Sequence, residues 1–230
     1  MFLSYAIQDV RYDLKETTLV SDYSKLDNFK YITLNKTQVY NNFELNQHHW
    51  TTNYVWNCFF PLLMKDLNLK YDEKDYELVC NYDEYNKVNL DYHDYKKNID
   101  LKLFNFTNNI TLLLNQKNIR LNKLDMGFGN NNVDCITNYH RLFRLYHETC
   151  LITNENSLTK RNLLLNADSM FIPVIPLIIP YFNNILYYDN RTDKSYKPLI
   201  DEYIQQTTDI IFCFIEENIH ISEKWKNIFQ

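Results

Sequence analysis

One stretch of the sequence sets a nucleophile beside an acid between two apolar runs. In "NLLLNADSMFIPVIPLIIPYF", residues 162–182, the polar pair Asp168 and Ser169 separates the runs. A serine attacks a carbonyl well only when a base takes its proton and a third group orients that base. Acyl transfer is therefore the first chemistry to consider, and the base has to be sought among the histidines.

The histidine pair in "NQHHWTT" is the best placed to supply a base. His48 and His49 come just ahead of a helix that apolar spacing predicts over Trp50–Leu69, with Pro61 as a flaw in it. A position at the rim, where a loop enters a helix, suits a catalytic base better than a core position does. The other histidines lack companion ligands at metal spacing, so we expect no metal site; they are His93, His140, His147 and His220.

Ser169 itself is expected where a strand leads into a helix. The start of a helix exposes unpaired N–H groups and the positive end of the helix dipole, which stabilise negative charge on a substrate oxygen. A structural explanation stays open beside this one, because Asp and Ser are also preferred helix caps. Asp168 in particular is expected to cap the helix.

The elements around this pair alternate in the last third of the chain. Apolar strands are predicted at 162–167, 184–189 and 209–216, with helices at 169–182 and 196–207 between them. Continuous apolar strands that alternate with helices predict a mostly parallel sheet covered on both faces, an α/β fold of three layers, α/β/α. Within the first helix, Pro176 and Pro180 must remove hydrogen bonds, so this segment should be kinked or broken into short turns.

The remaining sequence is less regular. It has strand candidates at 76–80, 99–106 and 110–114 and a helix candidate at 138–148. We expect a single domain over residues 1–230, with room for an irregular insertion around 72–135. The loop "GFGNNN", 127–132, lacks the strand and the Lys of a phosphate-binding loop. Asn130 in that loop is read as an oxyanion donor or as part of a plain turn, and no cofactor is implied.

Composition and charge narrow the classes of partner. The 230 residues carry a formal charge of −5 with no basic cluster, which argues against nucleic acid. The apolar segment 170–182 is too short and too rich in proline to span a membrane. No secretory signal is seen, so the chain as given is expected to be cytoplasmic. The cysteines show no CxxC spacing and fit free thiols; they are Cys58, Cys80, Cys135, Cys150 and Cys213.

Two blocks of the sequence together resemble a known family. "NQHHWTT" resembles the Asp-His-His-Trp signature of the DHHW family, and "LLLNADSMFIPVIPLIIPYFNNILYYDNR" resembles the serine block of SGNH hydrolases, in particular their alginate O-acetyltransferase-like branch. The blocks stand in the order of that branch and cover roughly a quarter of the chain. The resemblance implies an SGNH or flavodoxin-like fold and an acyl-transfer site.

Residue by residue, the resemblance makes Ser169 the nucleophile and His49 the general base. His48 would pack or hydrogen-bond beside them, and Arg191 matches an arginine for which an ion pair is expected. The orienting acid of the family stands two residues before the base, where this sequence has Gln47.

Gln47 is the main departure from the family pattern. A neutral amide cannot stabilise the imidazolium that forms during catalysis, and replacing the acid of a triad by an amide can cost about 10⁴ in rate. Either another acid serves, with Glu44 the nearest in sequence, or activity is weak or absent. The glycine of the serine block is also replaced, by Ala167.

These expectations give two functional hypotheses. The first is an O-acetyltransferase or O-acetylesterase that acts on a carbohydrate through Ser169 and His49 and needs no cofactor. The second is a catalytically degenerate SGNH-like domain that binds a glycan or a protein partner. Both are compatible with the sequence, which leaves the oligomeric state open.

Overall fold

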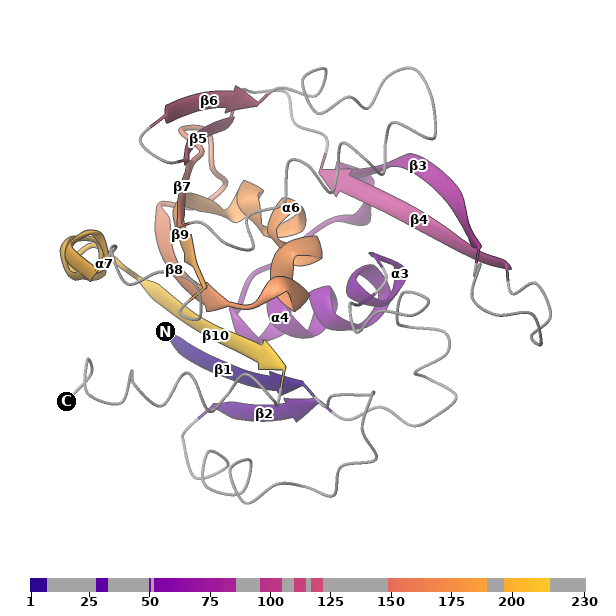
Figure 1. Cartoon of the computed structure of the whole chain (residues 1–230), viewed down its shortest axis with the longest axis horizontal. Coiled ribbons are helices and arrows are strands. Elements are labelled where there is room, and N and C mark those ends of the chain that lie inside the picture. The colour runs from indigo at the N-terminus through magenta and orange to yellow at the C-terminus, as the bar shows by residue number, and fades with distance from the viewer. Residues whose placement is uncertain are drawn as a thin grey trace.

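The protein is built on one eight-stranded sheet, seen in a computed structural model (Figure 1). The structure describes residues 1–7, 28–32, 50, 52–85, 96–104, 110–114, 117–121, 149–189 and 197–215. The strand order is β2-β1-β10-β8-β9-β7-β5-β6, so strands from both ends of the sequence lie side by side in the middle of the sheet.

Five neighbouring strands of this sheet are parallel, and three antiparallel strands extend it on one side. The parallel strands are β2 (Phe29–Ile32), β1 (Phe2–Ile7), β10 (Asp209–Ile215), β8 (Arg161–Ala167) and β9 (Phe182–Tyr188). The extension consists of β7 (Cys150–Thr153), β5 (Ile110–Leu114) and β6 (Lys117–Leu121). The strands expected at 162–167, 184–189 and 209–216 are therefore confirmed, and so is their mostly parallel arrangement.

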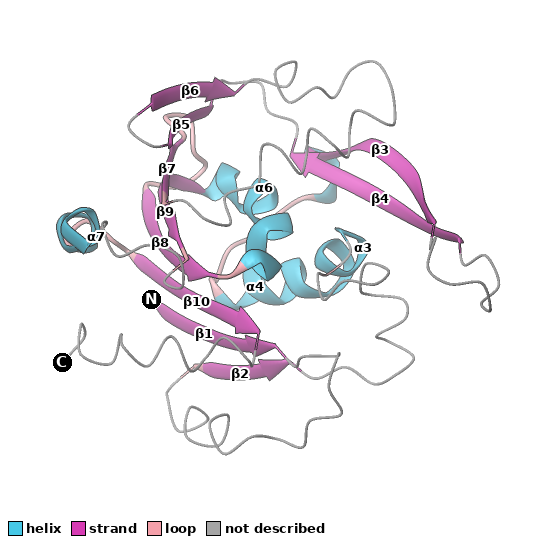
Figure 2. Ribbon diagram, in the orientation of Figure 1, coloured by secondary structure: helices cyan, strands magenta, loops and turns pink. Residues whose placement is uncertain are grey.

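Helices cover both faces of the sheet, which confirms the three-layer α/β fold (Figure 2). On one face lies α7 (Lys197–Ile204). On the other face lie two helical segments, one of α3 (Thr52–Tyr54), η1 (Val55–Phe59) and α4 (Phe60–Asp66), the other of η3 (Ser169–Val174), α6 (Ile175–Ile178) and η4 (Ile179–Tyr181).

The helix predicted from Trp50 is present, and Pro61 marks its irregularity. Pro61 has no N–H to donate to the carbonyl of Asn57, four residues earlier. The chain passes this point as a π-turn, in which the N–H of Phe60 donates to the carbonyl of Val55. The helix then ends at Asp66, and the positive φ of Asn68, 54°, reverses the chain two residues later.

The proline-rich segment is broken into short turns, as its sequence predicts. A 3₁₀ helix with Pro173 inside it is followed by one turn of α-helix, which has Pro176 near its start, and by a second 3₁₀ turn at Pro180. Each proline lacks the N–H that would continue the preceding helix. The segment stays compact because nearly all its side chains are buried against the sheet.

The region from 72 to 104 lies apart from the main sheet. After η2 (Glu73–Asp75), strands β3 (Tyr76–Tyr85) and β4 (Lys96–Phe104) form an antiparallel pair of their own. The strands predicted at 76–80, 99–106 and 110–114 are thus present, whereas the helix candidate at 138–148 lies outside the described residues. Among the described residues, every helix is too short or too polar to cross a membrane.

The described core has three clusters of buried residues: a large one, a small one under α7 and a third around Phe214. The large cluster fills the space between the sheet and the two helical segments and contains Trp50, Phe59, Phe171 and Tyr187. The small cluster lies under α7, where Leu164, Leu186 and Tyr203 meet. Because side chains alternate along a strand, β8 and β9 each contribute residues to the large cluster and to the cluster under α7.

A network of polar side chains lies at the amino rim of the sheet, the edge where β8 and β10 begin. Arg161 donates two hydrogen bonds to the carboxylate of Asp209 and one, of 2.9 Å, to the carbonyl of Leu67 at the end of α4. The side chain of Asp209 is only 2% exposed. The buried charge of Asp209 therefore depends on Arg161.

We expect Arg161→Met to destabilise the protein by about 3–5 kcal/mol, because it leaves a buried carboxylate without its main counter-charge. Urea unfolding followed by circular dichroism measures the change. Lys65→Met removes a cation from an exposed position of α4 and should stay within about 0.5 kcal/mol of the wild type. Equal stabilities of the two variants would contradict this assignment.

Candidate functional site

The serine predicted as nucleophile lies at the carboxyl rim, the opposite side of the sheet, where β1, β10, β8 and β9 end. Tyr5 of β1, Cys213 of β10 and Ala167 of β8 stand in register in one row across this rim. Ser169 follows two residues after Ala167, opens η3 and is partly exposed. Ligands of open parallel sheets bind outside the carboxyl ends of strands, so this is the expected place for a site.

Asp168 caps the start of η3, as the sequence predicts. Its carboxylate accepts a hydrogen bond of 3.0 Å from the N–H of Met170, and its carbonyl accepts one of 3.1 Å from the N–H of Phe171. Its own N–H donates to the carbonyl of Cys213 at 3.2 Å. Asp168 is 1% exposed, so these hydrogen bonds are buried and hold the turn that carries Ser169.

Cys213 is not suited to act as a second nucleophile at this rim. Burial raises the pKa of its thiol well above the usual value, and the charge of Asp168 raises it further. The thiolate, which is the reactive form, is therefore disfavoured. Its packing between Tyr5 and Ala167 makes Cys213 a core residue.

A second buried carboxylate, Asp189, lies at the same rim. Asp189 follows directly after β9 and is 2% exposed. The last registered pair of β8 and β9 is Asn166 with Tyr188, so Asp189 stands one position further, level with Ala167. Strand alternation puts it on the face of Ile185 and Tyr187, where η3 also packs.

A chain of aromatic contacts joins the histidine block to the serine block. Trp50, which follows His49 in the sequence, packs its ring against Phe59 with centroids 4.6 Å apart. Phe59 meets Phe171 edge to face at 5.9 Å, and Phe171 lies two residues after Ser169. Trp50, Phe59 and Phe171 are all fully buried or nearly so. The two blocks that the sequence singles out are therefore joined through one core.

Phe59 also contacts the ring of Tyr5 at 5.4 Å, which ties the same core to β1. The hydroxyl of Tyr5 donates to Asp66 at 2.8 Å, and Lys30 donates to the other oxygen of that carboxylate. Burial and the bond to Asp66 raise the pKa of Tyr5 far above its usual value, so Tyr5 stays neutral. This network anchors α4 to β1 and β2.

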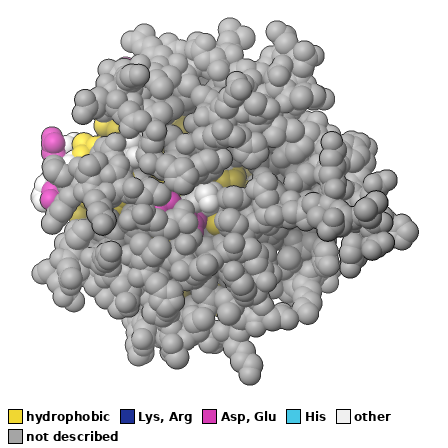
Figure 3. Space-filling model, in the orientation of Figure 1, with side chains coloured by type: hydrophobic (Ala, Val, Ile, Leu, Met, Phe, Trp, Pro, Cys, Tyr) yellow, Lys and Arg dark blue, Asp and Glu magenta, His cyan; other side chains and the backbone are white. Residues whose placement is uncertain are grey.

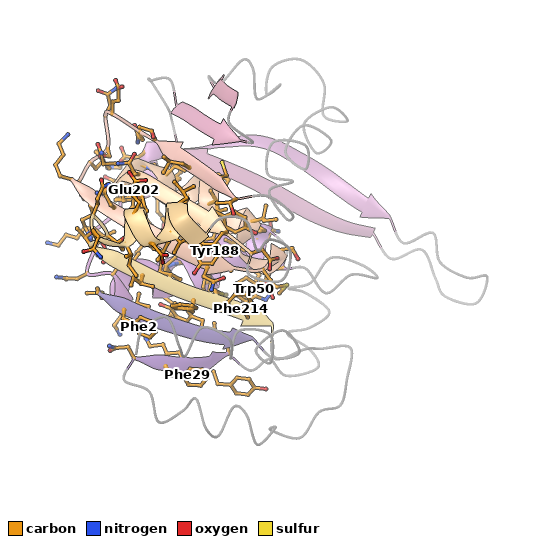
Figure 4. The ribbon with its side chains drawn as sticks, turned by 60° about the vertical axis from the view of Figure 1, so that its left-hand side comes forward. Phe2, Phe29, Trp50, Tyr188, Glu202 and Phe214 are labelled. Atoms are coloured by element: carbon orange, nitrogen blue, oxygen red, sulfur yellow. The ribbon has the colours of Figure 1, made fainter. Side chains whose placement is uncertain are left out.

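The figures agree on where these groups gather. Figure 4 shows the labelled side chains of Trp50, Tyr188 and Phe214 toward the end of the sheet at which the parallel strands finish. In Figure 3 acidic side chains and neutral polar atoms reach the surface near the centre of the face, over the point where β8 leads into the helical segment. The carboxyl rim therefore carries polar groups beside the apolar core.

Of the residues that the sequence singles out, Asp168 and Ser169 are placed together at this rim. Several others lie outside the described residues: Glu44, Gln47, His48, His49, Asn130 and Arg191. Sequence reasoning did not select Asp189, although an acid directly after the apolar strand "ILYY" is a signal for the carboxyl end of a parallel strand. Within the described ranges no group of three or more His, Cys, Asp and Glu could hold a metal ion.

Comparison with known proteins gives matches of structure. No family model matches the sequence. No curated protein matches it either. The fold is similar to that of PatB1 from Bacillus cereus, with a TM-score of 0.62 and 14% identity over 94% of this chain and 81% of that chain, in a structure with a sulfonyl adduct.

Two further structures agree with this comparison. Another structure of Bacillus cereus PatB1 gives a TM-score of 0.55 and 16% identity, covering 94% of this chain and 83% of that chain. A DHHW family protein from Eubacterium siraeum gives a TM-score of 0.60 and 13% identity, covering 94% of this chain and 78% of that chain. Identities this low show a shared fold, and the DHHW neighbour has the fold that the resemblance in the histidine block implied.

Phe59→Ala should destabilise the protein by about 3–5 kcal/mol, because it opens a cavity among Trp50, Tyr5 and Phe171. Phe59→Leu keeps most of the buried volume and should cost less. Leu158→Ala, at a side chain that is 60% exposed, is the control and should change stability by less than about 0.5 kcal/mol. Denaturant unfolding measures all three, and a loss near the control value for Phe59→Ala would refute the central position of this ring.

Asp168→Ala should cost about 1 kcal/mol, since it removes the side-chain cap of η3. Asp168→Asn should cost less, because an amide oxygen can still accept from the N–H of Met170. The two substitutions separate capping from charge in thermal unfolding experiments. If Asn were as damaging as Ala, the carboxylate charge and not the cap would be the stabilising feature.

Proposed function

We propose that this protein is an SGNH-like acyl-transfer enzyme, an O-acetyltransferase or O-acetylesterase that acts on a carbohydrate. Ser169 is the nucleophile and His49 the general base. The observation that carries the proposal is the position of Ser169, partly exposed after the central parallel strand β8 and held by a buried capping acid. The packing of Trp50, the neighbour of His49, onto Phe59 and through it onto Phe171 supports the pairing.

In the first half of the reaction, His49 takes the proton of the Ser169 hydroxyl while Oγ bonds to the carbonyl carbon of the acetyl ester. The tetrahedral intermediate then loses the alcohol, which receives that proton from His49, and the acetyl group stays on Ser169. In the second half, a water or sugar hydroxyl attacks the acetyl-serine and gives its proton through His49 to Oγ. Water yields acetate, and a sugar hydroxyl yields the transferred acetyl ester.

The negative charge of the intermediate needs hydrogen-bond donors. Because η3 is a short 3₁₀ turn before further breaks, aligned peptides add little dipole, and single N–H groups matter more. The N–H groups of Met170 and Phe171 point to Asp168. In this proposal the N–H of Ser169 is a donor to the oxyanion, with Asn130 as a second candidate.

The alternative is a degenerate domain that binds a glycan or a protein without turnover. Gln47, in the place of the orienting acid, and Ala167, in the place of the glycine, favour it. Arg191 and His48 would then serve binding. The two proposals differ in whether Ser169 reacts.

We expect Ser169→Ala to lower the hydrolysis of p-nitrophenyl acetate to the background rate of the buffer, because the nucleophile is lost. Ser157→Ala is the matched control. Ser157 lies in the loop before β8, near the amino rim, and donates to the carbonyl of Thr159. The control should hydrolyse the ester at the wild-type rate, and equal rates for all three proteins would remove the catalytic proposal.

A covalent probe gives the second arm of this test. One structural neighbour, PatB1, has been solved with a sulfonyl adduct, and sulfonyl fluorides form such adducts with activated nucleophiles. Phenylmethylsulfonyl fluoride should add one sulfonyl group to the wild type and to Ser157→Ala, but none to Ser169→Ala. Intact-protein and peptide mass spectrometry detect the label and its position.

A further inference from the structure

A serine and histidine pair needs a carboxylate, and the described structure offers two at the carboxyl rim. When His49 takes the proton of Ser169 it becomes a cation, which an acid stabilises and orients through the second ring nitrogen. Gln47 has no charge to offer. Asp168 and Asp189 are both buried, the first directly before Ser169 and the second level with Ala167 on the neighbouring strand.

Asp168 is already used in building the turn. Its Oδ1 accepts from the N–H of Met170 and its backbone bonds to Phe171 and Cys213. It also precedes Ser169 directly, so a ring that bridged the two side chains would have to fold back over a single peptide. Asp168 is therefore a capping residue and a poor partner for a base that must reach Ser169.

Asp189 has the position that such a partner needs. It stands level with Ala167 on the neighbouring strand, and neighbouring strands lie roughly 4.8 Å apart. Ser169 is two residues beyond Ala167 and opens η3, whose buried side chains pack on the face that Ile185 and Tyr187 line. An imidazole joined to each side chain by a hydrogen bond of roughly 2.8 Å spans more than one strand spacing, and the two-residue step from Ala167 to Ser169 supplies the additional distance.

Trp50, the residue after His49, lies on this face too. Trp50 packs with Phe59 over the core into which Ala167, Phe171 and Tyr187 also point. Tyr187 is two residues before Asp189 in the same strand direction. The element after His49, the turn of Ser169 and the end of β9 thus share one cluster of buried side chains.

We propose that Asp189 is the positioning residue of this site, its carboxylate accepting a hydrogen bond from the imidazole of His49 in place of the acid that Gln47 lacks. This inference rests on the proposed function. Asp189 holds the ring with its other nitrogen toward Ser169 and stabilises the imidazolium. The other titratable groups described at the rim are Asp168 and the neutral thiol of Cys213, and Tyr5 in the same row points its hydroxyl to Asp66 at the end of α4.

The test combines substitutions at both acid positions in the full chain. Asp189→Asn should lower kcat for p-nitrophenyl acetate by about 10³–10⁴-fold with KM little changed. Gln47→Asp alone should change kcat by less than about tenfold, because the site already has an acid. Gln47→Asp combined with Asp189→Asn should recover at least about a tenth of the wild-type kcat, since an acid is again available to the ring nitrogen that faces away from Ser169. Asp201→Asn, at an exposed position of α7, is the charge-matched control and should be silent.

The outcomes separate this inference from the proposed function. If Ser169→Ala abolishes activity while Asp189→Asn retains it, or if Gln47→Asp alone raises kcat a hundredfold or more, Asp189 is not the acid and the acyl-transfer proposal stands. If Ser169→Ala is as active as the wild type, the proposed function itself fails. A purely structural role of Asp189 would give a loss that Gln47→Asp does not repair.

A readout without turnover completes the test. The pKa of His49 is measured by NMR titration, with His49→Gln used to assign its signal. Asp189→Asn should lower this pKa by about 1–3 units, because a nearby carboxylate favours the charged ring. Asp201→Asn should leave it unchanged. An unchanged pKa in Asp189→Asn, as expected if Asp189 pairs with Arg191 instead, overturns the inference whether or not the enzyme is active.

Discussion

The structure depends on the packing of one ring, Phe59, between three elements that are far apart in the sequence. It touches Trp50 after the histidine pair, Tyr5 on the first strand and Phe171 beyond the serine. Burying an aromatic side chain removes a large apolar area from water, and contacts at these distances add specific edge and tilted geometries. The contact fixes where the helical segment from Trp50 lies on the sheet.

The two rims of the sheet use polar groups differently. At the amino rim, Arg161 and Asp209 satisfy each other's charge, and Asn162, Thr208 and Asn184 join neighbouring strands through their side chains. At the carboxyl rim, two buried acids lie beside a partly exposed serine. Ligands of such folds bind outside the carboxyl rim, so the acids there are placed to contact a bound group, whereas the pair at the amino rim joins β8 to β10.

The proline-rich segment connects these features. Its three breaks allow a short run of residues to turn from β8 to β9 while burying almost every side chain, which a straight helix of the same length would not do. The same compactness brings the end of β9, with Asp189, level with the end of β8. The prolines, which would be unfavourable in a straight helix, therefore help to set where the ends of β8 and β9 lie relative to each other.

The sequence by itself determined the elements and their class. Apolar runs of strand length, alternating with helical spacing, indicated β8, β9, β10 and the parallel sheet, because burial on both faces forces continuous apolarity. It also marked Asp168 and Ser169, since a capping acid before a nucleophile has a local signature. Only the tertiary structure decided the strand order, in which β1 lies beside β10. It also decided the register of β8 and β9, which puts Asp189 level with Ala167. The strand order depends on contacts between residues that are far apart in the sequence, such as Tyr5 and Cys213, and the β8–β9 register depends on how the proline-rich segment packs; no local pattern records which side chain fills which space.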